Sequence, residues 1–173
     1  MQSNIPTAAA LALSAAFAFG APAMSADLPQ AGSFTTHSAG KAIPQAVQVG
    51  DKHFMVSGTT WQVIYNDAGS GPLHMGSMVC KWSLDDVNGS YNITGVCAFG
   101  DAGGADKIFI GFSGKGIDKV GEKGTGTLTG GIGKYDGIQG KLAYQCKIID
   151  PVEVVFTCNE QIDYQLKAAS ATR

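Results

Sequence analysis

Residues 124–140 read GTGTLTGGIGKYDGIQG and hold seven of the chain's 24 glycines. Glycine adopts positive φ and lets another backbone approach closely, as a sharp corner between two barrel strands requires. We assign this role to Gly130, Gly131, Gly133, Gly137 and Gly140. The alternative, a phosphate-binding loop, needs a glycine where Leu128 stands and a serine or threonine in place of Tyr135. The segment therefore indicates a strand corner and argues against a nucleotide site.

Segments with strand-like alternation lie on both sides of this corner. The chain has 15% charged residues and no sustained helical period, which suits strands joined by tight turns. Eight segments are candidate strands: 52–57, 59–66, 75–84, 91–99, 107–114, 124–129, 141–149 and 153–166. Their connections are short, so neighbouring strands are expected to pair as antiparallel hairpins. The sequence predicts an all-β fold, an eight-stranded antiparallel up-and-down β-barrel.

The two ends of the chain are expected to lie outside the barrel. Residues 8–23 form a small apolar run typical of a secretory signal peptide, cleaved after Ala23 or Ala26, so that 1–26 is removed. That run is shorter than the roughly 20 residues of a membrane helix, and no later segment is apolar enough to span a bilayer. Residues 27–50 are predicted to form an extended arm, followed by one barrel domain at 51–167 and a tail at 168–173. A secreted or periplasmic protein is expected.

Charge and motif content exclude several functions. The 12 Lys and Arg residues balance 14 Asp and Glu residues, so no basic surface for nucleic acid is expected. The three histidines, His37, His53 and His74, are dispersed, and the cysteines lack the short spacing of a zinc site. We therefore expect no metal and no cofactor. No Ser-His-Asp order or His-Glu-x-x-His motif supports a hydrolase.

The dipeptide Asn88-Gly89 is a strong type I′ turn signal and fixes the register of one hairpin. Counting outward from this turn places Cys80 opposite Cys97 on the inward face. The close spacing of such a rung falls near disulfide geometry, and export supplies an oxidising compartment. We predict the disulfide Cys80–Cys97. The same count places Trp82 opposite Gly95, whose missing side chain gives the indole room over the partner strand.

The last hairpin turns around residues 150–152 and yields a second disulfide, Cys146–Cys158. The same alternation places Glu160 on the inward face, opposite Tyr144. A carboxylate inside an apolar barrel has its charged form disfavoured, which raises its pKa toward a range useful for acid–base work. We expect Tyr144 to donate a hydrogen bond to Glu160. This pair is the candidate catalytic or polar group of the interior.

The chain from 91 to 166, with the Leu128–Gly140 motif LTGGIGKYDGIQG at its centre, resembles the allene oxide cyclase and dirigent barrel superfamily. The resemblance implies a lipocalin-like barrel around an apolar cavity and a homo-oligomer, a trimer or a dimer. It also implies two activities. Plant members of the first kind cyclise unsaturated fatty-acid epoxides, and dirigent proteins guide the coupling of phenoxy radicals.

Three hypotheses of function follow from these observations. In the first, the barrel binds a small apolar or aromatic ligand without chemistry, as barrels of about eight strands can. In the second, the same cavity guides an isomerisation or cyclisation. The third is a filled barrel that acts through its outer surface. For both cavity hypotheses, the expected walls are Trp82, Phe99, Phe112 and Phe156.

Overall fold

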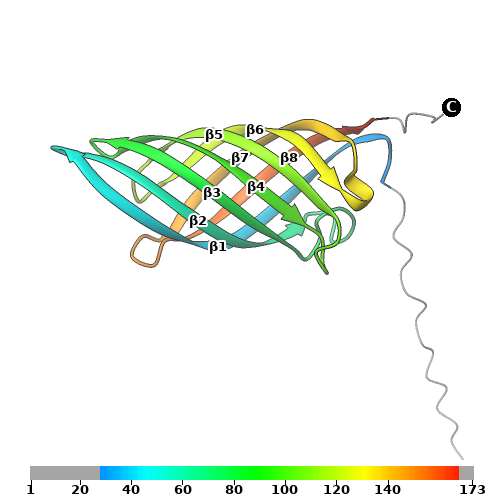
Figure 1. The fold of residues 1–173 in the computed structure, drawn as a ribbon. Coiled ribbons are helices and arrows are strands. Elements are labelled where there is room, and N and C mark those ends of the chain that lie inside the picture. The colour runs from blue at the N-terminus through cyan, green and yellow to red at the C-terminus, as the bar shows by residue number, and fades with distance from the viewer. Residues whose placement is uncertain (1–27, 168–173) are drawn as a thin grey trace, which may run out of the picture.

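The computed structural model describes residues 28–167 and has the form of an elongated closed barrel (Figure 1). Eight antiparallel strands follow one another in chain order, and the last pairs with the first. They are β1 (Ala31–Gly50), β2 (His53–Asn66), β3 (Gly76–Val87), β4 (Ser90–Gly100), β5 (Lys107–Ile117), β6 (Gly121–Ile132), β7 (Ile138–Asp150) and β8 (Val155–Leu166). A short 3-10 helix, η1 (Gly133–Tyr135), joins β6 to β7. The fold class predicted from the sequence is confirmed.

Two of the sequence-based expectations fall outside this range. The signal peptide at 1–26 and the tail at 168–173 lie outside the described residues. Within the part of the chain that the structure describes, no helix is long and apolar enough to cross a membrane.

The expected arm at 27–50 is wrong for most of its length. Ala31–Gly50 forms β1, which pairs with β2 on one side and with β8 on the other. This strand is hard to detect in the sequence because its inward positions include Thr36 and Ser38, which are almost fully buried polar residues. The two short strands expected at 52–57 and 59–66 form the single strand β2. The strand number remains eight because β1 replaces the strand lost by this merger.

The strands are staggered around the barrel. A row of paired residues starts at Thr36 on β1, passes Glu160 on β8 and then crosses the six remaining strands one after another, from β7 to β2. It returns to β1 at Ala46, ten residues further along. Such a stagger makes the strands tilt against the barrel axis, and eight strands then enclose an interior that side chains fill or that holds one small ligand. The inward side chains decide which of the two occurs.

Side chains fill the interior at one end, which we call the closed end. Large apolar residues with at most 1% exposure pack there: Ile64, Leu73, Phe99, Ile108, Ile110, Tyr135, Ile138 and Ile162. The Asp101 carboxylate connects three loops at this end. Its Oδ1 accepts hydrogen bonds from the Tyr135 hydroxyl and the Leu73 N–H, both at 2.8 Å, and Lys134 forms an ion pair with its other oxygen.

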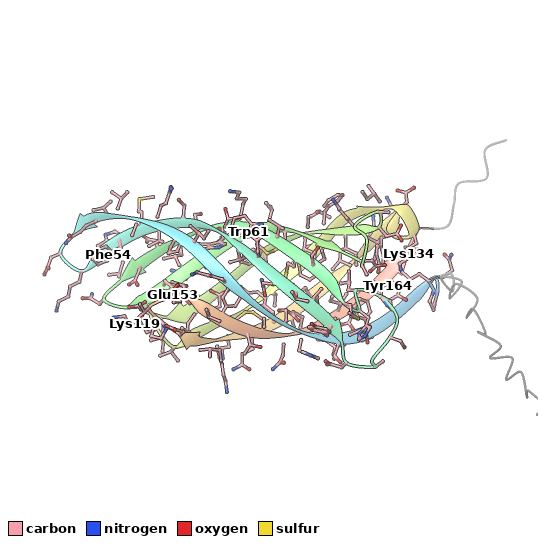
Figure 2. The ribbon with its side chains drawn as sticks, turned by 90° about the horizontal axis from the view of Figure 1, so that it is seen from below. Phe54, Trp61, Lys119, Lys134, Glu153 and Tyr164 are labelled. Carbon is pink, nitrogen blue, oxygen red and sulfur yellow. A yellow bond between two sulfur atoms is a disulfide. The ribbon has the colours of Figure 1, made fainter. Side chains whose placement is uncertain are left out.

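Both described chain ends also lie at the closed end (Figure 1). The Leu166 N–H donates to the Gln30 carbonyl at 2.7 Å, and the Lys167 N–H donates to the Gly137 carbonyl at 3.1 Å. The opposite end is formed by the four hairpin turns that follow β1, β3, β5 and β7. We call this opposite end the mouth. Figure 2 marks the two ends, with Lys119 at the mouth and Lys134 at the closed end.

The glycine segment forms a corner at the closed end, as the sequence predicts. Gly133, the first residue of η1, and Gly137, which follows η1, have φ of +66° and +73°, a conformation that residues with a Cβ rarely adopt. The other three glycines assigned to the corner also fit this role. Gly130 and Gly140 have positive φ, and Gly131 lies against a neighbouring backbone. The corner directs the Tyr135 side chain into the closed end, where it is fully buried.

Both cross-strand disulfides are confirmed. Asn88 and Gly89 form the β3–β4 turn with φ of +55° and +79°, and the register from this turn is the predicted one. The bridge Cys80–Cys97 has its Cα atoms 4.1 Å apart, and the bridge Cys146–Cys158 has them 4.0 Å apart. They join β3 to β4 and β7 to β8. Each disulfide therefore fixes one hairpin of the barrel wall.

Removing either disulfide should destabilise the barrel. The two bridges join residues 17 and 12 positions apart. For loops of this length the chain-entropy estimate is roughly 3 kcal/mol each. We expect the double variants Cys80→Ala/Cys97→Ala and Cys146→Ala/Cys158→Ala each to lose about that much free energy of unfolding in urea denaturation. A loss under about 1 kcal/mol for either pair would contradict this expectation.

Candidate functional site

The half of the barrel toward the mouth contains a cavity of about 330 Å³. All four aromatic residues expected to form its walls do line it: Trp82, Phe99, Phe112 and Phe156. Phe99 and Met78 also belong to the packed core, so they separate the cavity from the closed end. At the mouth the lining includes Asp118 and Lys119 from the β5–β6 turn and Pro151 from the β7–β8 turn. Both disulfides lie in the cavity wall.

The cavity exists partly because large inward rings lie flat over glycines. One row of paired residues alternates between the two kinds: Gly58, Trp82, Gly95, Phe112 and Gly126. A Cβ at Gly58 would overlap the Trp82 indole, and a Cβ at Gly95 would lie 2.6 Å from the Phe112 ring. Trp82 does face Gly95 in register, as predicted. However, Phe112 occupies the space over Gly95, and the indole leans the other way, onto Gly58.

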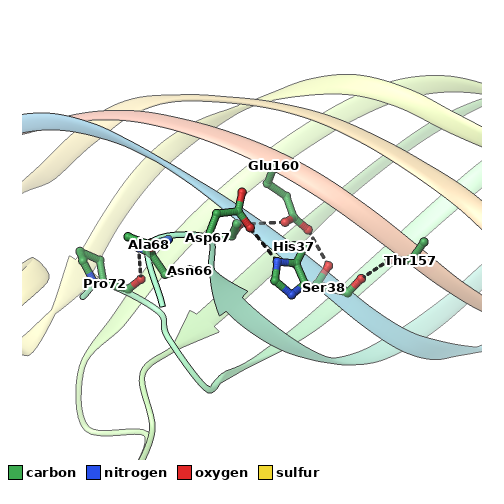
Figure 3. Close-up of polar contacts among 9 residues, drawn as sticks. His37, Ser38, Asn66, Asp67, Ala68, Pro72, Thr157 and Glu160 are labelled. Atoms are coloured by element: carbon green, nitrogen blue, oxygen red, sulfur yellow. Dashed lines mark hydrogen bonds and ion pairs between the residues drawn. The ribbon is translucent and has the colours of Figure 1, made fainter. Parts of the chain in front are cut away.

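Glu160 is inside the barrel, as the sequence predicts, and is 4% exposed. Its carboxylate contacts two hydroxyls of β1, with Thr36 Oγ1 at 2.8 Å and Ser38 Oγ at 2.6 Å (Figure 3 shows Ser38 beside it). Tyr144 is its register partner on β7. The expected hydrogen bond from Tyr144 is nevertheless wrong, because the partners of Glu160 come from β1 on its other side. The Tyr144 ring lies over Gly124 instead.

The hydrogen count at Glu160 fits the neutral acid. Ser38 Oγ lies 2.6 Å from Glu160 Oε1 and 2.8 Å from Gln62 Oε1, yet a hydroxyl has a single hydrogen to donate. In the neutral acid, Glu160 donates to Ser38, Ser38 donates to Gln62, and Thr36 donates to the second carboxyl oxygen. In the ionised form, Ser38 donates to Glu160 instead. Burial raises the pKa of Glu160, and the hydrogen bonds that Ser38 and Thr36 donate to the ionised form offset part of this rise. Burial therefore favours the neutral acid.

A neighbouring group at the closed end has a structural role. Asn66 is buried, donates to the Pro72 carbonyl at 2.9 Å and accepts from the Ala68 N–H at 3.0 Å, which fixes the β2–β3 loop (Figure 3). Asp67 faces outward and lies 2.6 Å from His37. The hydrogen bond with His37 lowers the pKa of Asp67. These side chains hold the loop behind Glu160 rather than line the cavity.

A second carboxylate, Glu122 on β6, also lines the cavity, and the sequence analysis missed it. Burial raises the pKa of its carboxyl group. The signal was available: Leu128, Gly126 and Gly124 alternate on the inward face, and the next position is Glu122. The strand predicted at 124–129 starts too late, since β6 begins at Gly121.

Three buried polar atoms of the cavity residues have no hydrogen-bond partner within residues 28–167. They are Thr60 Oγ1, Trp82 Nε1 and the Tyr144 hydroxyl. A buried donor without a partner is costly, and most buried polar groups in proteins are paired. All three belong to residues that line the cavity. The cavity wall therefore retains hydrogen-bonding capacity.

No protein-family model matches this chain, and no curated protein does either. Among residues 28–167, no group of three or more His, Cys, Asp or Glu side chains is placed to hold a metal. Two of the three histidines pair with carboxylates on the outer surface, His37 with Asp67 and His53 with Asp85 at 2.7 Å.

Glu160→Gln should change the pH dependence of stability. Because the pKa of Glu160 is raised from 4.5 in the folded state, folding retains a proton that the unfolded chain has already lost above that pH. Stability therefore falls as pH rises from about 4.5 toward the folded pKa, by up to about 1.4 kcal/mol per pH unit. Glutamine mimics the neutral acid. Urea denaturation from pH 4 to 8 should show similar stability at pH 4 and a growing advantage for the variant above it. Parallel curves would refute the assignment.

Gly58→Ala should displace the Trp82 ring. The added methyl group occupies the space of the indole, and overpacking of this kind costs about 1–3 kcal/mol. Trp82 fluorescence should shift as the ring moves. The matched control is Gly111→Ala on β5, where the nearest atom to the new Cβ, Thr129 Cγ2, is 3.9 Å away. We expect the control to change stability by less than about 0.5 kcal/mol, and equal effects in the two variants would contradict the ring placement.

Proposed function

We propose that this protein is an exported binding protein that holds one small apolar or aromatic molecule in its barrel. The observation that carries the proposal is the cavity of about 330 Å³ with aromatic walls. Core residues fill the barrel at the closed end and leave the half toward the mouth open. Ligand cavities typically measure about 300–1,000 Å³, are mostly apolar and contain a few polar groups. The volume lies at the small end of this range, which favours a compact ligand.

Export belongs to the same proposal. The two disulfides are compatible with an oxidising compartment such as the periplasm or the extracellular space. The apolar run at 8–23 supplies the signal that would direct the chain there. Oligomerisation into a trimer or a dimer is likewise a proposal. A row of paired apolar residues on the outer face of the barrel supports it, formed by exposed Trp61, Val79 and Phe109 together with half-buried Ala98.

A second candidate is an isomerase or cyclase that uses the same cavity. The observation that favours it is the carboxyl group of Glu160, whose pKa burial raises and which lines an apolar cavity. Such a group suits proton transfer at mild pH. The resemblance to allene oxide cyclase and dirigent barrels agrees with this candidate. The binding function needs only the cavity, so we place it first. The third hypothesis, a filled barrel, has less support because the half toward the mouth is not filled.

Filling the cavity should abolish binding. Ala42 on β1 faces the cavity, and Ala39 on the same strand faces outward. We propose to titrate 2-phenylethanol into the Trp61→Phe protein, in which Trp82 is the remaining tryptophan of the two in the chain, and to follow its fluorescence. Ala42→Leu should weaken binding by about tenfold or more, whereas Ala39→Leu should leave it unchanged. Native mass spectrometry of protein from its own host should also reveal a retained ligand.

Two results would contradict the binding function. One is the lack of any saturable response of Trp82 to the probe. The other is equal weakening by Ala42→Leu and Ala39→Leu. A different result would favour the isomerase: the protein converts a retained ligand to product, and the Glu160→Gln variant still binds this ligand but no longer converts it.

A further inference from the structure

The wall of the cavity nearer the mouth holds a group of one carboxyl and two phenols that the Glu160 network does not include. Glu122 on β6, Tyr91 on β4 and Tyr144 on β7 all face inward and line the cavity. The row of paired residues through Glu160 meets β6 at Gly124, and Glu122 lies two residues closer to the β5–β6 turn. Glu122 therefore occupies a second level of the cavity, above Glu160 and nearer the mouth.

Glycines allow the two phenols to approach Glu122. Gly116 on β5 is paired with Tyr91 on one side and with Glu122 on the other. A Cβ at Gly116 would overlap the Tyr91 ring, so this phenol crosses β5 toward β6. The Tyr144 hydroxyl would lie 2.7 Å from a Cβ at Gly124, which is the neighbour of Glu122 on the inward face of β6. The glycines thus serve to gather these three polar side chains.

The electrostatic field at this level is negative. Burial raises the pKa of Tyr91, and the charges of Glu122, Asp118 and Asp86 raise it further. Burial and the charge of Glu122 raise the pKa of Tyr144 in the same way. Four acidic side chains line the cavity: Asp86, Asp118, Glu122 and Glu160. Burial favours the neutral form of Glu160, so the negative field comes from Asp86 and Asp118 at the mouth and from Glu122 when it is ionised. Among residues 28–167, Lys119 is the one basic side chain in the lining. A cavity lined mostly by one sign of charge attracts ligands of the opposite sign.

The hydrogen-bond acceptors at this level of the cavity also suit a cationic ligand. The Tyr144 hydroxyl is buried and has no partner within residues 28–167. A phenol oxygen and a carboxylate both accept hydrogen bonds, and an ammonium group offers three donors. Aromatic faces add to this, because a cation is attracted to the face of a tryptophan or tyrosine ring. Trp82, Phe112 and both tyrosines line the same space.

We propose that Glu122, Tyr91 and Tyr144 bind the ammonium group of a small primary amine whose apolar body lies deeper in the cavity. The inference rests on the proposed binding function and specifies the ligand class for it. An anionic ligand is disfavoured by the carboxyl groups of Asp86, Asp118 and Glu122, and a neutral alcohol would leave the negative field uncompensated. The ligand class is an arylalkylamine or a similar amphiphilic amine. Its amine lies toward the mouth, and its apolar end points toward Phe99.

Three probes of similar size and different charge test the proposal: 2-phenylethylamine, 2-phenylethanol and phenylacetate. They are titrated into the Trp61→Phe protein, with Trp82 fluorescence as the readout. We expect the amine to bind at least about tenfold more tightly than the alcohol, and the anion to bind most weakly. Glu122→Gln should reduce the ratio of amine affinity to alcohol affinity to within about threefold. Tyr91→Phe should reduce the preference in part.

The matched control is Glu153→Gln. It makes the same change of charge in the β7–β8 turn at the mouth end, where Glu153 is exposed and pairs with Lys41 outside the cavity. It should keep the full amine preference. Circular dichroism of each variant confirms that the barrel is folded, and Tyr91→Phe serves as the second variant if Glu122→Gln does not fold.

The outcomes separate the two proposals. Equal affinity for amine and alcohol, or an amine preference that persists in Glu122→Gln, overturns the ammonium site and leaves the binding function intact. Loss of the preference in Glu153→Gln as well also overturns it, because the effect would then come from the overall charge. No response to any probe overturns both.

Discussion

The pairing of β1 with β8 is the interaction on which the other features of this barrel depend. Its eleven rungs turn an open sheet into a closed one, and closure removes the exposed edges that make a sheet prone to aggregate. The same rungs bring Thr36 and Ser38 beside Glu160, so the polar group inside the barrel forms only when the sheet closes. Folding and assembly of the site are therefore one event. Local hairpins can form earlier, but none of them contains the complete group.

Closure leaves an interior that the choice of side chains then divides. At the closed end, branched and aromatic residues fill the space, and Asp101 holds the loops over them. Toward the mouth, the aromatic residues alternate with glycines around the circumference, and each ring lies against the wall instead of crossing the middle. Stability and a ligand-sized space thus come from different halves of one barrel. A larger residue at Gly58 would displace the Trp82 ring from the wall.

The sequence predicts what is local and misses what depends on distant partners. The β3–β4 hairpin could be placed to the residue because Asn88-Gly89 fixes both the turn and the register, and both disulfides follow from such counting. The strand β1 could not be identified because its inward residues are polar, and they are buried only through contact with a strand more than a hundred residues away. The hydrogen bonds of Glu160 were missed for this reason. Glu122 was missed because the strand predicted at 124–129 starts too late, although the inward alternation of Gly126 and Gly124 continues to Glu122.

The position of the chain ends has a consequence for attachment. Gln30 and Lys167 both lie at the closed end, on the far side of the packed core from the mouth. A fusion partner, a surface linkage or an anchor joined to either end would leave the opening facing away from the point of attachment. The barrel can thus be tethered by either end with its cavity presented to the surrounding medium.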